Sequence, residues 1–393
     1  MPYQLPNRAL ALISVSVLLS TSTWFSGTAA TPILRELWDL SDVQCSWLTI
    51  SVQLGFILGT FLYALLNLPD VFPTRIVFFT SATLAALFNC GFAILSQDFP
   101  TSLAFRFLTG VTLAGIYPVG MKLVAQWFQA GLGWCLGVLL AALTLGTAFP
   151  YLMFALGAAP EWRLLLLTAS GLTLLGGCVV LFFVPPGPFL SEAAVFEPRM
   201  VFRVFRLRAF RLQALGYFGH MWELYAFWSL VALYLNASFQ HTRSGMVDSV
   251  PLLTFAVIAA GSLGCLLGGW ISRGVGERAV ALVSLGVSGS LCAASWWLFE
   301  QDAMVVAAAA LIWGMFVIAD SPQFSALAAR HCPPQYTGTA LTIQNGLGFG
   351  ITVLSIQLTA TLGQHYGWRW AFAALVFGPI LGIFALLRLR REQ

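Results

Sequence analysis

Residues 216–228 read Gly-Tyr-Phe-Gly-His-Met-Trp-Glu-Leu-Tyr-Ala-Phe-Trp, which places an imidazole and a carboxylate inside an apolar segment. The segment runs from about residue 212 to residue 235, and about 20 apolar residues suffice for a helix to cross a bilayer. His220 and Glu223 are three positions apart, so they lie on one face of such a helix. A charged side chain at the bilayer centre costs about 2.5 to 3.5 kcal/mol on insertion scales, so the pair is a candidate functional site.

The composition is that of a polytopic membrane protein. Hydrophobic residues make up 59% of the chain and charged residues only 9%, whereas an ordinary soluble domain carries about 25% charged residues. Period-2 alternation is absent, which argues against a β-barrel. We therefore predict an all-α protein with twelve transmembrane helices, near residues 9–30, 46–66, 76–95, 102–125, 132–156, 164–184, 212–235, 251–271, 279–299, 304–328, 339–362 and 370–387.

Two features of the sequence have alternative readings. The first apolar segment follows Arg8 and ends in small residues, as a secretory signal does, but eleven more apolar segments follow and favour a retained first helix. The seven cysteines are scattered singly with no C-x-x-C motif, which favours buried thiols over disulfides or a metal site. We expect no metal ion and no cofactor.

The basic residues predict the orientation. With a cytoplasmic N-terminus, the outer side holds five of the 19 basic residues, which leaves 14 on the inner side; the five are Arg35, Arg106, Arg163, Arg243 and Arg369. The positive-inside rule therefore predicts that both termini are cytoplasmic, in the plasma membrane or bacterial inner membrane. The net charge of +4 is explained by this topology, and we expect a lipid bilayer and no nucleic acid as a partner.

A change of composition divides the chain into two halves. Prolines at positions 185, 186 and 188 end the sixth predicted helix, and five arginines follow between positions 199 and 211. We predict an N-terminal six-helix bundle over residues 1–188, a basic cytoplasmic linker over residues 189–210, and a C-terminal six-helix bundle over residues 211–393. We expect the linker to form a short interfacial helix whose arginines face lipid headgroups.

The two halves resemble each other at a shift of about 204 residues. The matches keep the same order along both halves: Gly110 with Gly314, Pro118 with Pro322, Gly146 with Gly350, Trp24 with Trp228, and Trp162-Arg163 with Trp368-Arg369. Such a repeat predicts two pseudo-symmetric bundles, related by an axis along the membrane normal, with a binding site between them near the midplane.

These features resemble the major facilitator superfamily over essentially the whole chain. Arg106 and Gly110 resemble the family's R-x-x-x-G motif in the fourth span, and Asp70 and Arg75 resemble the acidic and basic residues of its loop between spans two and three. That loop lacks the family's glycines and clustered basic residues, and the fifth span lacks the family's G-P-x-x-G-G antiporter signature. The resemblance implies a transporter fold whose cavity is lined chiefly by spans one, four, seven and ten.

Three residues are candidates for proton coupling. Glu223 lies midway along the seventh span, where a carboxyl group in apolar surroundings can bind and release a proton. His220 could share that proton or bind the substrate; its structural alternative is a satisfied donor between helices. Asp320 precedes Pro322, which leaves a backbone carbonyl of the tenth span without its usual partner and predicts a bend that lines a cavity.

Lys122, the only lysine, either extends to the interface, offers a positive charge to an anionic substrate, or serves as a partner for an acid. We expect Arg106 to organise its helix and the proton path, alongside the helix-breaking Pro118 and Pro322. Buried amides in a span either bond across helices or contact ligand. The predicted substrate-binding residues are Trp24, Thr28, Gln53, Tyr117, Lys122, Tyr217, Trp222, Gln323 and Asn345.

The sequence thus predicts a monomeric secondary transporter that moves a small polar, anionic or zwitterionic organic solute by alternating access. The embedded acids and the absent antiporter signature favour proton symport, with proton-coupled export as the alternative. A channel and a membrane-embedded enzyme are less favoured: the proline-broken, duplicated bundles suit rocking, and the histidines form no cluster with a nucleophile or metal ligands.

Overall fold

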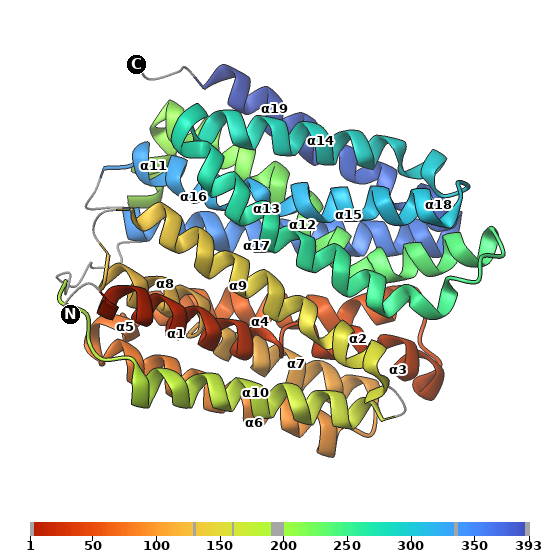
Figure 1. The fold of residues 1–393 in the computed structure, drawn as a ribbon, viewed down its shortest axis with the longest axis horizontal. Helices are drawn as coiled ribbons and strands as arrows, with labels where there is room; N and C mark the ends of the chain where they lie inside the picture. The colour runs from red at the N-terminus through yellow and green to blue at the C-terminus, as the bar shows by residue number, and fades with distance from the viewer. Residues whose placement is uncertain (1–3, 129–130, 159–160, 190–199, 334–336, 390–393) are drawn as a thin grey trace. The chain divides into compact units, whose positions relative to one another are not determined.

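The computed structural model describes residues 4–128, 131–158, 161–189, 200–333 and 337–389, and this part of the chain is helical with no strand. It divides into two compact units, the first Met1–Leu40 with Trp47–Phe196 and the second Ser41–Ser46 with Glu197–Gln393. One boundary, between Phe196 and Glu197, falls within residues 189–210, and Ser41–Ser46 groups with the second unit. Figure 1 colours the first unit mainly red to yellow and the second mainly green to blue.

The first unit consists of helices joined by short connections. Its elements are α1 Gln4–Thr21, α2 Ser26–Ala29, α3 Thr31–Trp38, α4 Asp42–Leu65, α5 Leu68–Val71, α6 Thr74–Leu95, α7 Phe99–Leu113, α8 Tyr117–Ala125, α9 Leu132–Met153 with a π-helical turn Phe154–Ala158, and α10 Trp162–Phe183.

The second unit begins with a short helix in the linker. Its elements are α11 Met200–Arg206, α12 Arg208–His241, a 3-10 turn Val247–Ser249, α13 Val250–Val275, α14 Glu277–Leu298, α15 Ala303–Ala319, α16 Ser321–Arg330, α17 Thr337–Tyr366, α18 Trp368–Ala371, a 3-10 turn Phe372–Val376, and α19 Phe377–Arg388.

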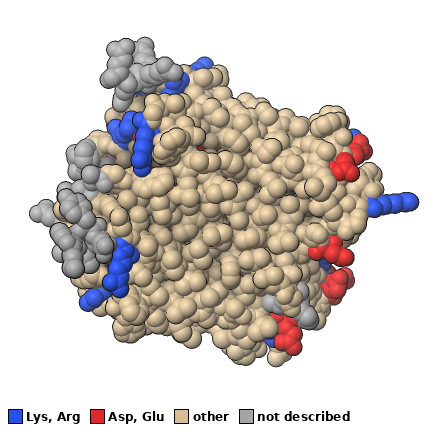
Figure 2. Space-filling view, viewed as in Figure 1, with Lys and Arg blue, Asp and Glu red and all other residues tan. Residues whose placement is uncertain are grey.

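Ten of the twelve predicted spans are helices long and apolar enough to cross a membrane, counted over the described residues. The other two are the first, which α1 and α2 form with a break between them, and the seventh, α12, which carries many polar side chains. Together they make a twelve-helix membrane protein. In Figure 2 the charged side chains lie toward the left and right edges of the view. The broad surface between them is formed by other residues, as a lipid-facing surface requires.

Proline breaks the same span in each half. α7 ends at Leu113 and α8 begins at Tyr117, just before Pro118, while α15 and α16 meet at Asp320, two residues before Pro322. Proline has no N–H to donate, so the helix is interrupted at these points, as predicted for the tenth span.

The two proline-broken spans also begin in the same way, with an aspartate at the N-cap, a match that the sequence comparison did not include. Asp98 accepts a hydrogen bond from the Thr101 N–H at 2.8 Å, and Asp302 accepts one from the Met304 N–H at 2.8 Å. Both are N-caps, and they are 204 positions apart. The hydrogen bonds from Thr101 hold the pKa of the exposed Asp98 carboxyl below its ordinary value.

Glycines bring the backbones of neighbouring helices together. A Cβ added at Gly110 would lie 2.0 Å from the Val52 carbonyl oxygen, and one added at Gly314 would lie 1.9 Å from the Val257 carbonyl oxygen. The two matched glycines therefore make the same kind of crossing, α7 on α4 and α15 on α13. The match between Gly146 and Gly350 is different. A Cβ at Gly146 would meet the Leu18 carbonyl at 2.2 Å, but one at Gly350 would meet nothing within 4 Å.

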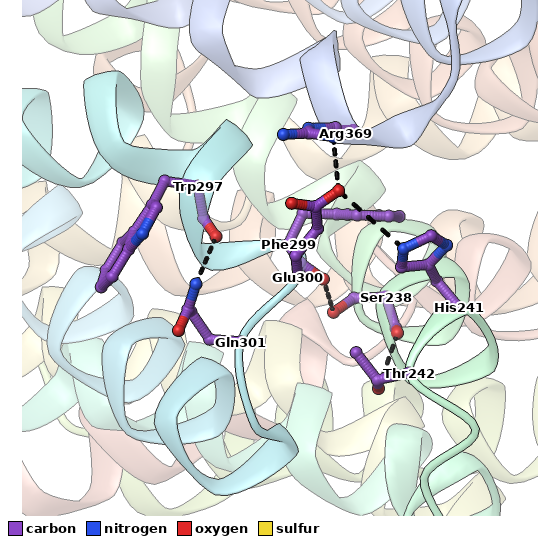
Figure 3. A network of polar contacts seen from close by, with 8 residues as sticks. All are labelled: Ser238, His241, Thr242, Trp297, Phe299, Glu300, Gln301 and Arg369. Carbon is purple, nitrogen blue, oxygen red and sulfur yellow. Dashed lines mark hydrogen bonds and ion pairs between the residues drawn. The ribbon is translucent and has the colours of Figure 1, made fainter.

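The matched Trp-Arg pairs also act differently. Arg163 lies over the Trp162 ring and donates from Nε to the Ala93 carbonyl at 3.1 Å. Arg369 instead pairs with Glu300, whose carboxylate also lies 4.0 Å from His241 Nε2 (Figure 3). This network joins the loop between α14 and α15 to the ends of α12 and α18.

We predict that Gly110→Ala and Gly314→Ala each destabilise the protein by about 1 to 3 kcal/mol, because the added methyl group forces two packed backbones apart. Gly171→Ala is the matched control, since Gly171 is an exposed residue inside α10 with nothing within 4 Å of an added Cβ. Thermal unfolding of the purified protein in detergent measures the difference. Equal melting temperatures for Gly110→Ala and Gly171→Ala would contradict this packing.

Candidate functional site

The first span is broken between Thr21 and Ser26, and Arg106 of α7 binds the break. Its guanidinium donates from Nε to the Leu48 carbonyl at 3.0 Å, from Nη1 to the Thr23 carbonyl at 2.8 Å, and from Nη2 to the Trp24 carbonyl. The Arg106 side chain is fully buried. Because carbonyls at a helix break lack their intrahelical N–H partners, the arginine supplies the hydrogen bonds that the helix cannot.

Gly27 makes room for this contact. A Cβ at position 27 would lie 2.9 Å from Arg106 Nε, so a larger residue would displace the guanidinium. The predicted substrate residues of this region are buried around the break. Trp24 packs against Phe56 with ring centroids 4.8 Å apart, and Thr28 shares a 2.7 Å hydrogen bond with Thr49. Gln53 on α4 is also buried.

Lys122 lies near the end of α8 and contacts the loop between α4 and α6. Its ammonium group pairs with the Asp70 carboxylate and donates to the Pro69 carbonyl at 2.8 Å. Of the three roles predicted for Lys122, the structure therefore shows the partner of an acid, which the sequence did not identify as Asp70. Asp70 is therefore held by a lysine of the fourth span, while Arg75, the other loop residue of the resemblance, is half-buried at the start of α6.

Glu223 lies inside the second unit, against α14 and α15. Its carboxylate accepts hydrogen bonds from Ser288 Oγ at 2.8 Å, Cys292 Sγ at 3.3 Å and Trp313 Nε1 at 2.6 Å. The side chain is only 1% exposed. Ser288 and Cys292 are four positions apart on α14, so one helical face supplies two of the three donors. Glu223 thus joins three helices through three hydrogen bonds.

His220 and Asp320 form a second buried polar group, at the break between α15 and α16. His220 Nδ1 lies 2.8 Å from Asp320 Oδ1, and both side chains are buried. His220 Nε2 and Gln323 Nε2 are buried without a hydrogen-bond partner among the described residues. Buried polar atoms are nearly always hydrogen-bonded, so each of these two nitrogens is available to bond a further group.

Of the other predicted substrate-binding residues, one lies beside His220 and the others lie elsewhere. Tyr217 is buried with its ring 6.0 Å from the His220 ring, so it belongs to this second group. Trp222 is half-buried and donates to the Ala374 carbonyl at 3.4 Å, in the packing between α12 and the 3-10 turn before α19. Tyr117 and Asn345 are half-buried on α8 and α17. Their contact with a substrate stays a prediction.

Sequence reasoning missed the groups that hold the acids in place. Ser288, Cys292 and Trp313 were not assigned to Glu223, although the i, i+4 spacing of a serine and a cysteine in an apolar span was a usable signal. A buried amide pair was also missed, in which Gln213 Nε2 donates to Gln344 Oε1 at 2.7 Å and ties α12 to α17.

The sequence model of the Major Facilitator Superfamily matches residues 12–356 of the chain. The chain belongs to this superfamily. It is therefore a membrane transporter and not an enzyme. A search of curated protein sequences found no match.

Solved transporters of the Major Facilitator Superfamily share the fold. A point mutant of the nucleoside transporter NupG aligns with a TM-score of 0.75 at 12% identity, covering 98% of this chain and 100% of its own. The human organic anion transporter MFSD10 (TETRAN) aligns with a TM-score of 0.70 at 15% identity, covering 97% and 99%. At such low identity the likeness establishes the fold alone.

We predict that Arg106→Ala destabilises the first unit by roughly 3 kcal/mol or more, because buried carbonyls left unsatisfied cost about 1 to 3 kcal/mol each. Arg106→Lys restores the charge but not the three-way geometry, so we expect it to recover little stability. The yield of monodisperse protein and its melting temperature measure the effect. If Arg106→Lys were as stable as the parent, charge rather than carbonyl bonding would explain the residue.

We predict that Glu223→Ala lowers stability by about 2 to 4 kcal/mol, because it leaves the hydroxyl, thiol and indole donors without an acceptor. Ser288→Ala removes one donor and should cost about 1 kcal/mol. Ser229→Ala is the control, since Ser229 Oγ donates to the Tyr225 carbonyl of its own helix at 2.5 Å and has no partner on another helix among the described residues. Melting temperatures that follow a different order would argue against a structural role for Glu223.

Proposed function

We propose that this protein is a proton-coupled secondary transporter that imports a small polar organic solute by alternating access. The observation that best supports the proposal is the buried pair His220 and Asp320, 2.8 Å apart at a break in the tenth span. Ionisable pairs are rare within the hydrocarbon layer, and those at broken helices of transporters face the binding region.

The charge of the pair explains how proton binding and conformation could be linked. With one proton the pair is neutral overall, either as imidazolium with carboxylate or as imidazole with carboxylic acid. Without that proton it carries one negative charge, which a buried, low-dielectric site strongly disfavours. The pair therefore releases its proton only when water or solute reaches it, which ties proton movement to opening.

His220 Nε2 is the atom at which the proton enters and leaves. Nδ1 is occupied by Asp320, whereas Nε2 is buried without a described partner. Nε2 donates in the protonated pair and accepts in the deprotonated pair, so it can bond a solute or a water in either state. Gln323 Nε2 offers a fixed donor from the first turn of α16.

Glu223 is the second candidate for the coupling proton. Three donors on α14 and α15 hold its carboxylate in place between those helices. This arrangement favours a structural role for Glu223 and the coupling role for His220 and Asp320. Transport kinetics of the two acid variants distinguish these roles.

The solute is proposed only as a class. Lys122 favoured an anionic or zwitterionic solute, but its pairing with Asp70 removes that argument. By their names, NupG carries nucleosides and MFSD10 carries organic anions, and a small organic solute with several polar groups covers both. Such a solute would find donors and acceptors at His220, Gln323 and Tyr217.

We also infer a cytoplasmic location for both termini, a plasma membrane or bacterial inner membrane setting, and a monomeric unit of function. The predominance of arginine near the linker and the C-terminus supports the orientation. Proton-coupled export is the alternative direction, and the same coupling pair would serve it.

We predict that Asp320→Asn abolishes proton-driven accumulation of solute but preserves solute exchange, because the amide keeps the shape and loses the charge. Proteoliposomes with an imposed pH gradient measure accumulation, and counterflow without a gradient measures exchange. The solute is chosen beforehand by thermal shift across compound classes. Glu223→Gln is the matched acid variant and should keep gradient-driven uptake.

The same assay separates the alternatives. Uptake that does not saturate with solute would favour a channel, and accumulation only under an inverted gradient would favour export. Gradient-driven uptake that is unchanged in Asp320→Asn and lost in Glu223→Gln would assign the coupling to Glu223 instead.

A further inference from the structure

The corner between α11 and α12 is fixed on the second unit by apolar packing. Val204 is 2% exposed and belongs to a buried cluster, and Phe205 packs against it with its ring centroid 5.2 Å from that of Phe210. The buried members of the cluster are Val204, Phe210, Ala214, Ala328, Cys332 and Ala340. The linker helix α11 is therefore packed into the second unit.

Arg211 fixes the corner from the other side. Its Nη1 donates to the Phe205 and Arg206 carbonyls, each at 3.3 Å, so it caps the last turn of α11. The arginines before it are thus held in a defined arrangement along the corner.

Arg203, Arg206 and Arg208 are exposed at this corner, and none of them makes an ion pair with a described residue. Other basic residues of the same unit are engaged: Arg330 pairs with Glu277 at 2.9 Å, and Arg278 donates to the Leu386 carbonyl at 2.7 Å. Three guanidinium groups so close in sequence, without an acidic partner among the described residues, favour a negatively charged partner.

An exposed leucine lies among these arginines. Leu207, between Arg206 and Arg208, is 40% exposed, and Leu215, two turns into α12, is 37% exposed. Leu215 lies within the seventh span and is covered by the bilayer in either case, but a soluble anion at the arginines would leave Leu207 without an apolar partner. A phospholipid would cover Leu207 with its acyl chains while the arginines bind its phosphate, as basic and apolar residues do at a membrane surface.

We propose that Arg203, Arg206 and Arg208, arranged around Leu207, form a binding site for the headgroup of an anionic phospholipid. Guanidinium groups bind phosphate oxygens through paired N–H donors. Each basic residue near an anionic surface strengthens binding by about fivefold, so the three together provide about 100-fold preference over a zwitterionic lipid. The site is separate from the His220 and Asp320 pair and does not depend on the transported solute.

The test is native mass spectrometry of the full chain in detergent, titrated with phosphatidylglycerol or phosphatidylcholine. We expect the parent to prefer phosphatidylglycerol, the triple variant Arg203→Gln, Arg206→Gln, Arg208→Gln to lose about 100-fold in affinity for it, and the triple lysine variant to stay within about fivefold. Arg243→Gln is the matched control, because Arg243 is an exposed arginine in the loop after α12 and should leave binding unchanged.

Two outcomes would overturn the proposal. One is a triple glutamine variant that binds phosphatidylglycerol as the parent does. The other is that glycerol 3-phosphate displaces bound phosphatidylglycerol as effectively as added phosphatidylglycerol does. That result would indicate a site for a soluble phosphate. If the triple glutamine variant does not fold, the three single variants decide: losses of about fivefold each support the site, and unchanged affinities refute it.

Discussion

The structure depends on one constraint: a polar group placed in hydrocarbon must find its partner within the protein. The first span shows how strictly this holds. Where its helix breaks, the Thr23 and Trp24 carbonyls are bound by a guanidinium from α7 rather than left bare. Glu223 shows the same for a side chain, since two other helices supply its three donors.

Against this background, the unsatisfied atoms carry the functional argument. His220 Nε2 and Gln323 Nε2 are buried without described partners, and both lie at or near the break that Pro322 introduces. We propose that these two atoms, beside the buried pair of His220 and Asp320, bind a group that comes and goes. This contrast separates the acid that holds helices together from the acid that we propose takes part in transport.

Much of the fold could be predicted because the features that a membrane requires appear in short stretches of sequence. Apolar length marks the spans, proline marks the break at Asp320, and the repeat marks the glycine crossings at Gly110 and Gly314. The break in the first span could not be predicted, since it contains no proline and its partner Arg106 is 82 residues from Trp24. The sequence allowed an acidic partner for Lys122 but did not identify it as Asp70, because that pairing depends on distant segments meeting.

The sequence predicted the ionisable residues of the candidate site but not the side chains that hydrogen-bond to Glu223. His220, Glu223 and Asp320 were identifiable because charge inside a span is costly wherever the helix points. The hydrogen bonds that hold Glu223 come from Ser288, Cys292 and Trp313. These side chains are not unusual in the sequence, and only the fold shows that they contact the carboxylate. The sequence therefore ranked Glu223 first, and the geometry favours Asp320 with His220.

The most direct measurement is infrared difference spectroscopy of the reconstituted protein between two pH values, which reports the carboxyl groups that gain or lose a proton. We expect a protonation signal that is altered or lost in Asp320→Asn and in His220→Gln and that persists in Glu223→Gln. A signal that is lost only in Glu223→Gln, and is unchanged in the other two variants, would contradict the assignment of the coupling proton to His220 and Asp320.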